Sequence, residues 1–245
     1  MTKLTLIILL ALPGAALAQA PSADDLARRA IDAVGGPAWE KVRYIAFTFK
    51  VENAGKGTSA FPQKWDRFTG EYRVSGKDPQ GNDFEIVMNV NARKGRATLN
   101  GTPVTDIRKH IEMMNLGVRR FVNDTFWLLM PLKMLEPVAH RTSEGQRNDS
   151  CGRVWDVLKL TFDEGSLMPG DVYWAWINHD TGIVEEWDIR LATKPDKAPT
   201  EVILRDFRRI SGVLISTRRE IRGENQNVRL EDLQILQEVP KGAFR

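Results

Sequence analysis

The chain has 245 residues, 35 basic and 32 acidic side chains, a net charge of +3 and a single cysteine, Cys151. One thiol excludes an intramolecular disulfide and any cysteine-based zinc site, and the balanced charge without a basic helix or zinc knuckle argues against nucleic-acid binding. The length is sufficient for one large hydrophobic core, so we expect one domain that needs no disulfides.

The first 20 residues have the pattern of a secretory signal peptide. Lys3 supplies a positive start, residues 4–12 are apolar, and residues 16–18 read Ala-Leu-Ala, a typical cleavage site. The apolar run is too short to span the roughly 30 Å of a bilayer's hydrocarbon core. We therefore expect a cleaved leader, a mature chain that starts at Gln19 or Pro21, and export to the periplasm.

Residues 21–36 predict an amphipathic helix, which Ser22 can cap and which Gly35-Gly36 ends. Its first turn is acidic, as the helix dipole favours. Short strand patterns follow at residues 44–51, twice within 64–74, at 84–90 and at 96–99.

The pattern changes between residues 104 and 137, where apolar residues stop alternating. We predict two helices here, one capped by Thr105 and running to Met114, the other from Val118 to Leu129 and ended by Pro131. Large apolar side chains then gather at Phe126, Trp127, Leu128, Leu129, Met130, Leu132, Met134 and Leu135. They are too many for a helix that faces water, so we expect this insertion to pack on a sheet.

Strand patterns resume in the rest of the chain, at residues 154–162, 172–178, 183–191, 201–210, 213–222 and 230–239. The turn at 178–182 predicts a hairpin. About ten strands joined by short turns indicate a mainly β domain with some α, covering residues 21–245, with a helical insertion at about 104–137.

The strand at 172–178 carries two tryptophans. Trp174 and Trp176 share one face, opposite Tyr173, Ala175 and Ile177, because side chains alternate along a strand. Since both faces are apolar, we expect this strand to be covered on both sides.

Arginines cluster at positions 205, 208 and 209 and again at 218, 219 and 222. We interpret both groups as a solvated sheet face in preference to an anion-binding patch. Contact of this face with anionic head groups stays an open question.

Patterns of catalysis are absent. The chain has no nucleophile elbow, no HExxH motif and no phosphate loop, and its histidines, His110, His140 and His179, have no partner at ligand spacing. We read them as structural or solvent-facing residues. The carboxylates between 163 and 171 do not fit a calcium loop and indicate turns. We therefore expect no catalytic residue, no metal ligand and no cofactor.

Four segments carry a resemblance to a known superfamily. An N-terminal helix ends in AVGG and is followed by Trp39, and residues 174–189 read WAWINHDTGIVEEWDI. Both resemble the exported LolA/LolB-like proteins, which are lipoprotein carriers and their lipid-binding relatives. The stretches NDTFWLLMPLKMLEP and FDEGSLMPGDVYWAWIN more closely resemble an uncharacterised exported family near them.

The resemblance implies one strongly curved antiparallel sheet, an incomplete β-barrel, with helices plugging its open side. In such carriers the space between sheet and helices takes acyl chains. We therefore predict an apolar cavity that binds a lipid or an acylated ligand, a class that includes lipoproteins, with transient contact at a membrane surface. The predicted lining residues are Phe126, Trp127, Met130, Leu135, Trp174 and Trp176.

Three alternatives remain open from sequence. The same residues can fill a closed core. A periplasmic enzyme acting on an apolar substrate would need an acid/base pair, for which His110, Asp124 and His140 are the candidates. A ligand-free module that binds another envelope component is the third. The sequence leaves the ligand, the protein partners and the oligomeric state undetermined.

Overall fold

A computed structural model describes residues 21–245 except 56, 165 and 167, so the predicted signal peptide lies outside the described residues. The first half of the chain forms α1 (Ala23–Ala33), α2 (Gly36–Glu40), β1 (Tyr44–Asn53), β2 (Gly57–Asp66), β3 (Glu71–Lys77), β4 (Asp83–Asn89), β5 (Lys94–Leu99) and β6 (Thr102–Pro103). The second half forms α3 (Ile107–Lys133), β7 (Ala139–Asn148), β8 (Val154–Phe162), β9 (Val172–Asn178), β10 (Val184–Arg190), β11 (Thr200–Ile210), β12 (Val213–Ile221) and β13 (Gln226–Leu236).

All of these strands belong to one antiparallel sheet with 13 strands among the described residues. Their order is β6-β5-β4-β3-β2-β1-β13-β12-β11-β10-β9-β8-β7, so β6 and β7 are the two edges and do not pair with each other. The predicted fold class, a mainly β chain with an open, incomplete barrel and helices, is confirmed.

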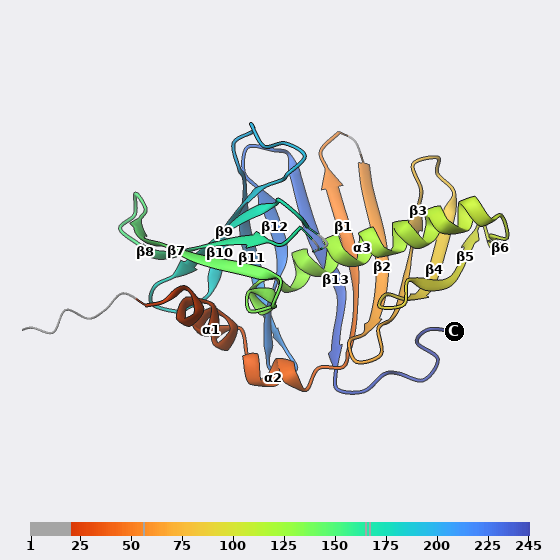
Figure 1. Ribbon diagram of the computed structural model, residues 1–245, viewed down its shortest axis with the longest axis horizontal. Coiled ribbons are helices and arrows are strands. Elements are labelled where there is room, and N and C mark those ends of the chain that lie inside the picture. The colour runs from red at the N-terminus through yellow and green to blue at the C-terminus, as the bar shows by residue number, and fades with distance from the viewer. Residues whose placement is uncertain (1–20, 56, 165, 167) are drawn as a thin grey trace, which may run out of the picture.

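The path of the chain explains the length of α3. Strands β1 to β6 step from the centre of the sheet to one edge, and β7 to β13 step back from the other edge to the centre. There β13 pairs with β1, with Tyr44 opposite Leu236. Between the two edges α3 runs along the inner face of the sheet (Figure 1). A helix of 27 residues is about 40 Å long, which lets one helix connect the edges.

The prediction of two helices between 104 and 137 is wrong, because α3 is a single helix. It begins one residue later than predicted, at Asp106 in place of Thr105 as the cap, and the Asp106 side chain accepts a hydrogen bond from the backbone N–H of Lys109 at 2.8 Å. Aspartate is preferred over threonine as a helix cap, so residue preference agrees with Asp106 in place of Thr105.

Neither Gly117 nor Pro131 interrupts α3. Gly117 sits against β4, where an added Cβ would lie 2.6 Å from Met88 Sδ. Its role is therefore to let the helix approach the sheet closely. Pro131 lies in the last turn, where it removes only the hydrogen bond to the Trp127 carbonyl. The helix continues to Lys133.

Strand β7 is an edge strand that the sequence pattern missed. Nine of its ten residues are exposed or half-exposed, and its polar sequence AHRTSEGQRN has no apolar alternation. Charged and polar side chains are typical of edge strands, since they discourage pairing with another chain. β6 and β7, which match none of the predicted strand patterns, account for a strand number above the predicted ten.

The core lies mainly between the inner face and α3, and a small cluster lies on the outer face. On the inner face α1 contributes Leu26, Ala27 and Ala30. On the outer face the C-terminal tail covers β1, where Phe244 packs edge-on against Tyr44. Within the part of the chain that the structure describes, no helix is both long and apolar enough to cross a membrane.

Candidate functional site

The candidate site is the contact between the C-terminal half of α3 and the inner face of the sheet, which we call the α3 seam. Its centre is aromatic: the Phe126 ring stacks on Trp187 with centroids 5.6 Å apart and lies 4.6 Å from the Tyr173 ring. Such pairs contribute about 0.5–1.5 kcal/mol beyond the area that they bury. Met130 and Met134 are buried in the same cluster.

Trp127 joins two halves of the core. It packs against the cluster on β8–β11 and against the cluster on β1, β12 and β13. Its ring lies edge-on to Trp187 at 5.6 Å and edge-on to Phe49 at 6.5 Å. Because the indole is only partly buried, Trp127 is the point where the seam meets the surface.

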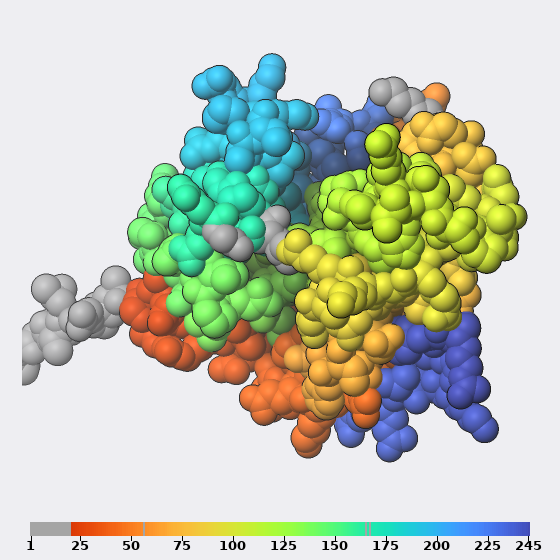
Figure 2. Space-filling view, turned by 45° about the vertical axis from the view of Figure 1, so that its right-hand side comes forward, coloured from red at the N-terminus to blue at the C-terminus, as the bar shows by residue number. Residues whose placement is uncertain are grey.

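Side chains fill the seam in this structure. A small space beside α3 has a volume of about 10 Å³ and is lined by residues that include Leu128, Leu132, Leu204 and Arg219. That space holds one water molecule at most, so a long chain cannot enter without displacing side chains. The surface is hollowed beside α3, between the lime helix and the cyan residues near 195 (Figure 2).

The structure brings four of the six predicted lining residues together. Phe126 and Met130 are buried in the seam, and Trp127 and Leu135 pack at its border. Trp174 and Trp176 lie on the opposite, outer face of β9, because Tyr173, Ala175 and Ile177 point inward. The sequence pattern grouped these residues correctly by face but did not show which face is inside.

The expectation that the strand at 172–178 is covered on both sides is wrong. Trp174 and Trp176 are half-exposed, and each lies beside a charged side chain. Trp176 Nε1 donates to Asp188 at 2.9 Å, and the Arg190 guanidinium lies 5.1 Å from the centroid of the Trp174 ring. The two tryptophans are therefore not part of the α3 seam.

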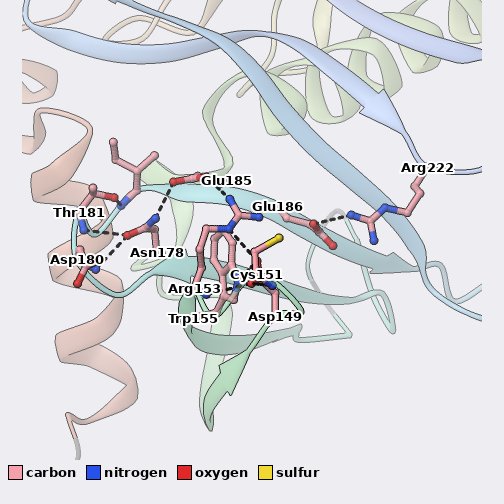
Figure 3. Close-up of polar contacts among 11 residues, drawn as sticks. Asp149, Cys151, Arg153, Trp155, Asn178, Asp180, Thr181, Glu185, Glu186 and Arg222 are labelled. Atoms are coloured by element: carbon pink, nitrogen blue, oxygen red, sulfur yellow. Dashed lines mark hydrogen bonds and ion pairs between the residues drawn. The ribbon is translucent and has the colours of Figure 1, made fainter.

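The outer face of the same strands carries a network of ion pairs (Figure 3). Arg153 pairs with Asp149 at 2.7 Å and lies over the Trp155 ring, while Arg222 pairs with Glu186 at 3.2 Å. These partners are partly exposed, and such pairs contribute about 0–1 kcal/mol each. For Arg222 the predicted solvated sheet face is correct.

Arg219 departs from that prediction. The residue belongs to the arginine cluster at 218–222, yet it points inward and only 1% of it is exposed. Its Nη1 donates to the Ser216 carbonyl, Nη2 donates to the Leu128 carbonyl on α3 at 3.5 Å, and Nε has no partner. Burial lowers the pKa of the guanidinium to about 9, so the group still carries its charge at pH 7.

The alternation along β12 contained a signal for this. Val213, Ile215 and Ile221 are buried, and they share their face with Arg219, whereas Arg218 points outward to Asp206 at 2.8 Å. A charged residue in phase with three apolar ones is the pattern of a buried charge.

A second buried polar group lies further along α3. Asp124 is completely buried and forms an ion pair with Arg120 at 2.8 Å. Asn123 Nδ2 donates to the same carboxyl at 2.8 Å, and so does the side-chain amide of Gln63. Tyr72 Oη in turn donates to Gln63 Oε1 at 2.6 Å.

Burial is the largest influence on Asp124, and it raises the pKa of that carboxyl to about 6 although the Arg120 charge opposes the rise. The Arg120 guanidinium also lies 3.6 Å from the centroid of the Phe61 ring. The spacing of Arg120 and Asp124, four residues apart on one helix, is a signal that sequence reasoning did not use.

The three groups proposed for an enzyme do not converge. His110 and Asp124 are on the same helix, 14 residues and therefore about 21 Å apart along its axis. His140 is exposed and pairs with Asp163. An acid/base pair must reach one reacting centre, so this set cannot act together.

His179 was predicted to be structural or solvent-facing, and the structure shows that a buried carboxylate holds its ring. Its Nδ1 lies 2.9 Å from Asp156, a buried carboxyl that Arg29 of α1 also contacts at 3.1 Å. The contacts hold α1 against the sheet. Among residues 21–245, without the three that are left out, no group of three or more potential ligands could hold a metal ion.

Two solved structures share this architecture. A LolA superfamily protein from Nitrosomonas europaea aligns with a TM-score of 0.56 and 12% identity, over 92% of this chain and 98% of that chain. The fold is LolA-like. A DUF1329 family protein from Desulfovibrio piger aligns with a TM-score of 0.52 and 13% identity, over 91% and 97% of the two chains. These likenesses confirm the resemblance for the fold alone. No protein-family model and no curated protein matches the sequence.

Proposed function

We propose that this protein is exported to the periplasm and binds the acyl chain of a lipid or lipidated protein in the α3 seam. One observation carries the proposal: α3 covers a long apolar stretch of the inner face and is attached to the strands beneath it through side-chain contacts. The backbone hydrogen bonds of the described residues include none between α3 and a strand. The sheet is complete without α3, so the helix can shift while every strand pair stays intact.

The energies are compatible with such a shift. Each methylene removed from water contributes about 0.8 kcal/mol, so a chain of a dozen methylenes supplies roughly 10 kcal/mol. That gain offsets the displacement of seam side chains, because the incoming chain replaces their apolar contacts. Met130 and Met134 suit this exchange, since methionine side chains are flexible and adapt to different neighbours.

The LolA-like fold supports the same conclusion, since it places the helix over the open side of the sheet. The leader-like residues 1–20 support export. Loading from a membrane surface requires only transient contact, in which the seam border at Trp127 faces the lipid.

The test is mass spectrometry of organic extracts from protein purified without detergent out of its native compartment. We expect an acyl-chain ligand in near-stoichiometric amount. Two matched variants locate the site: Trp127→Asp puts a charge at the seam border, and Trp174→Asp puts the same charge on the outer face. Both tryptophans are half-exposed, so folding should suffer similarly.

Loss of the ligand in Trp127→Asp, with retention in Trp174→Asp, is the expected result. Circular dichroism must show that both variants fold. An empty extract from the wild-type protein that also stays empty after incubation with lipid vesicles would refute acyl-chain binding. Loss of the ligand only in Trp174→Asp would move the site to the outer face.

A further inference from the structure

The charge of Arg219 has no counter-ion. None of the Asp or Glu side chains in the described residues lies within 4.0 Å of its guanidinium as an ion-pair partner, and the residues left out include no Asp or Glu. Its neighbours on the adjacent strands, Leu204 and Val228, are buried and apolar. An isolated buried charge is costly, so such groups are normally paired.

The free donors of Arg219 suit a carboxylate. Arginine has five N–H donors, of which two reach the carbonyls of Ser216 and Leu128. The others include the Nε–H, which has no partner. A guanidinium edge with two parallel N–H groups matches the two oxygens of a carboxylate and binds them side by side.

The surroundings of Arg219 suit an alkyl chain. Arg219 lines the small space beside α3 together with Leu128, Leu132 and Ile215, so an anion that reaches it there must be attached to something apolar. Inorganic anions and sugars are excluded by this lining, because their remaining polar groups would be buried without partners.

We propose, on the basis of the function proposed above, that the ligand of the α3 seam is a single-chain amphiphile with an anionic carboxylate head, and that Arg219 binds that head. The chain extends from Arg219 along the seam beside Leu128 and Leu132. The ligand supplies the counter-charge that the protein lacks. The class of ligand is thereby a long-chain free acid in preference to a neutral lipid.

The experiment compares three ligands of equal chain length with the full mature protein. Tetradecanoate, tetradecanol and methyl tetradecanoate, each below its aggregation concentration, displace a neutral fluorescent probe from the wild type and from two variants. Arg219→Met removes the buried charge and keeps the length of the side chain. Arg218→Met is the control, because it removes a neighbouring charge that points outward.

We expect the wild type and Arg218→Met to bind the acid at least 10-fold more tightly than the alcohol or the ester. Arg219→Met should bind all three with similar affinity, near that of the alcohol for wild type. If the wild type binds the acid and the alcohol equally, or if Arg219→Met still prefers the acid, the role of Arg219 is refuted while acyl-chain binding stands. If the wild type binds none of the three, the proposed function itself fails.

A second measurement does not depend on the variant. The carboxyl carbon of ¹³C-labelled tetradecanoate reports its own ionisation by NMR. Contact with the Arg219 guanidinium lowers the pKa of the bound carboxyl below that of the same acid in water, because the ionised form is stabilised. A bound carboxyl with a raised pKa would place the head in an apolar part of the seam, away from Arg219.

Discussion

Two arginines lie in the interface between α3 and the sheet, and only one has an acidic partner. Arg120 pairs with Asp124, and Gln63, Asn123 and Tyr72 complete the hydrogen bonds around that carboxyl. Arg219 has two carbonyl contacts and no carboxylate. The first region holds its buried arginine beside a counter-ion, whereas the second holds an unmatched charge. We therefore expect α3 to be held more firmly near Asp124 than near Arg219.

The largest change in stability is expected at Arg120, the arginine with an acidic partner. Arg120→Met leaves Asp124 buried without its counter-ion, and we expect a loss of about 3 kcal/mol in the free energy of unfolding. Urea denaturation at pH 7 measures it. Arg119→Met, an exposed neighbour on the same helix, is the control and should change stability little. A loss below 1 kcal/mol for Arg120→Met would mean that the pair does not anchor the helix.

A smaller effect follows from the pKa of Asp124. The folded-state pKa of about 6 lies above the ordinary value of 3.8, so folding favours the protonated carboxyl and stability falls as pH rises from about 4 to about 6. Asp124→Asn cannot ionise and lacks this term. The stability of the variant relative to the wild type should therefore rise by on the order of 2 kcal/mol between pH 4 and pH 7. A pH-independent difference would contradict the raised pKa.

The smallest effect, with the opposite sign, is expected at the unpaired site. Arg219→Met removes a buried charge that lacks a counter-ion, so the ligand-free protein should keep its stability or gain about 1 kcal/mol. Urea denaturation of delipidated protein measures it, with Arg218→Met alongside. A loss above 2 kcal/mol would show that the bonds to the Ser216 and Leu128 carbonyls are the reason for the buried arginine.

Much of the fold was predictable because its signals are local. The cap at Ser22, the turn at 178–182 and the alternation along β4 depend on residues that are close in sequence. The continuity of α3 was not predictable in this way. Gly117 and Pro131 are helix breakers by intrinsic propensity, but packing against Met88 and a place in the last turn made both compatible with a helix.

The candidate site was predictable in part for a related reason. The apolar residues between 126 and 135 predicted a helix face that packs on the sheet, and Phe126 and Met130 lie in that face. Alternation assigned Trp174 and Trp176 to one face but gave no sign of which face the helix covers. Arg219 was grouped with its exposed neighbours by charge, although its phase matched the buried residues Val213 and Ile215. The position of Arg219 in the alternation along β12 therefore indicated burial, whereas its charge indicated exposure.

The pairing of β1 with β13 determines which strand pair of the sheet can form last. Tyr44 and Leu236 are opposite each other, although nearly the whole chain separates them. A chain delivered from its N-terminus forms β1 to β6 as successive neighbours, but one side of β1 stays unpaired until β13 arrives. Strands β7 to β12 can pair with one another in the meantime, but they join β1 only through β13. The last strand to emerge therefore links the two halves of the sheet, and a chain cut before it would leave one side of β1 and one side of β12 unpaired.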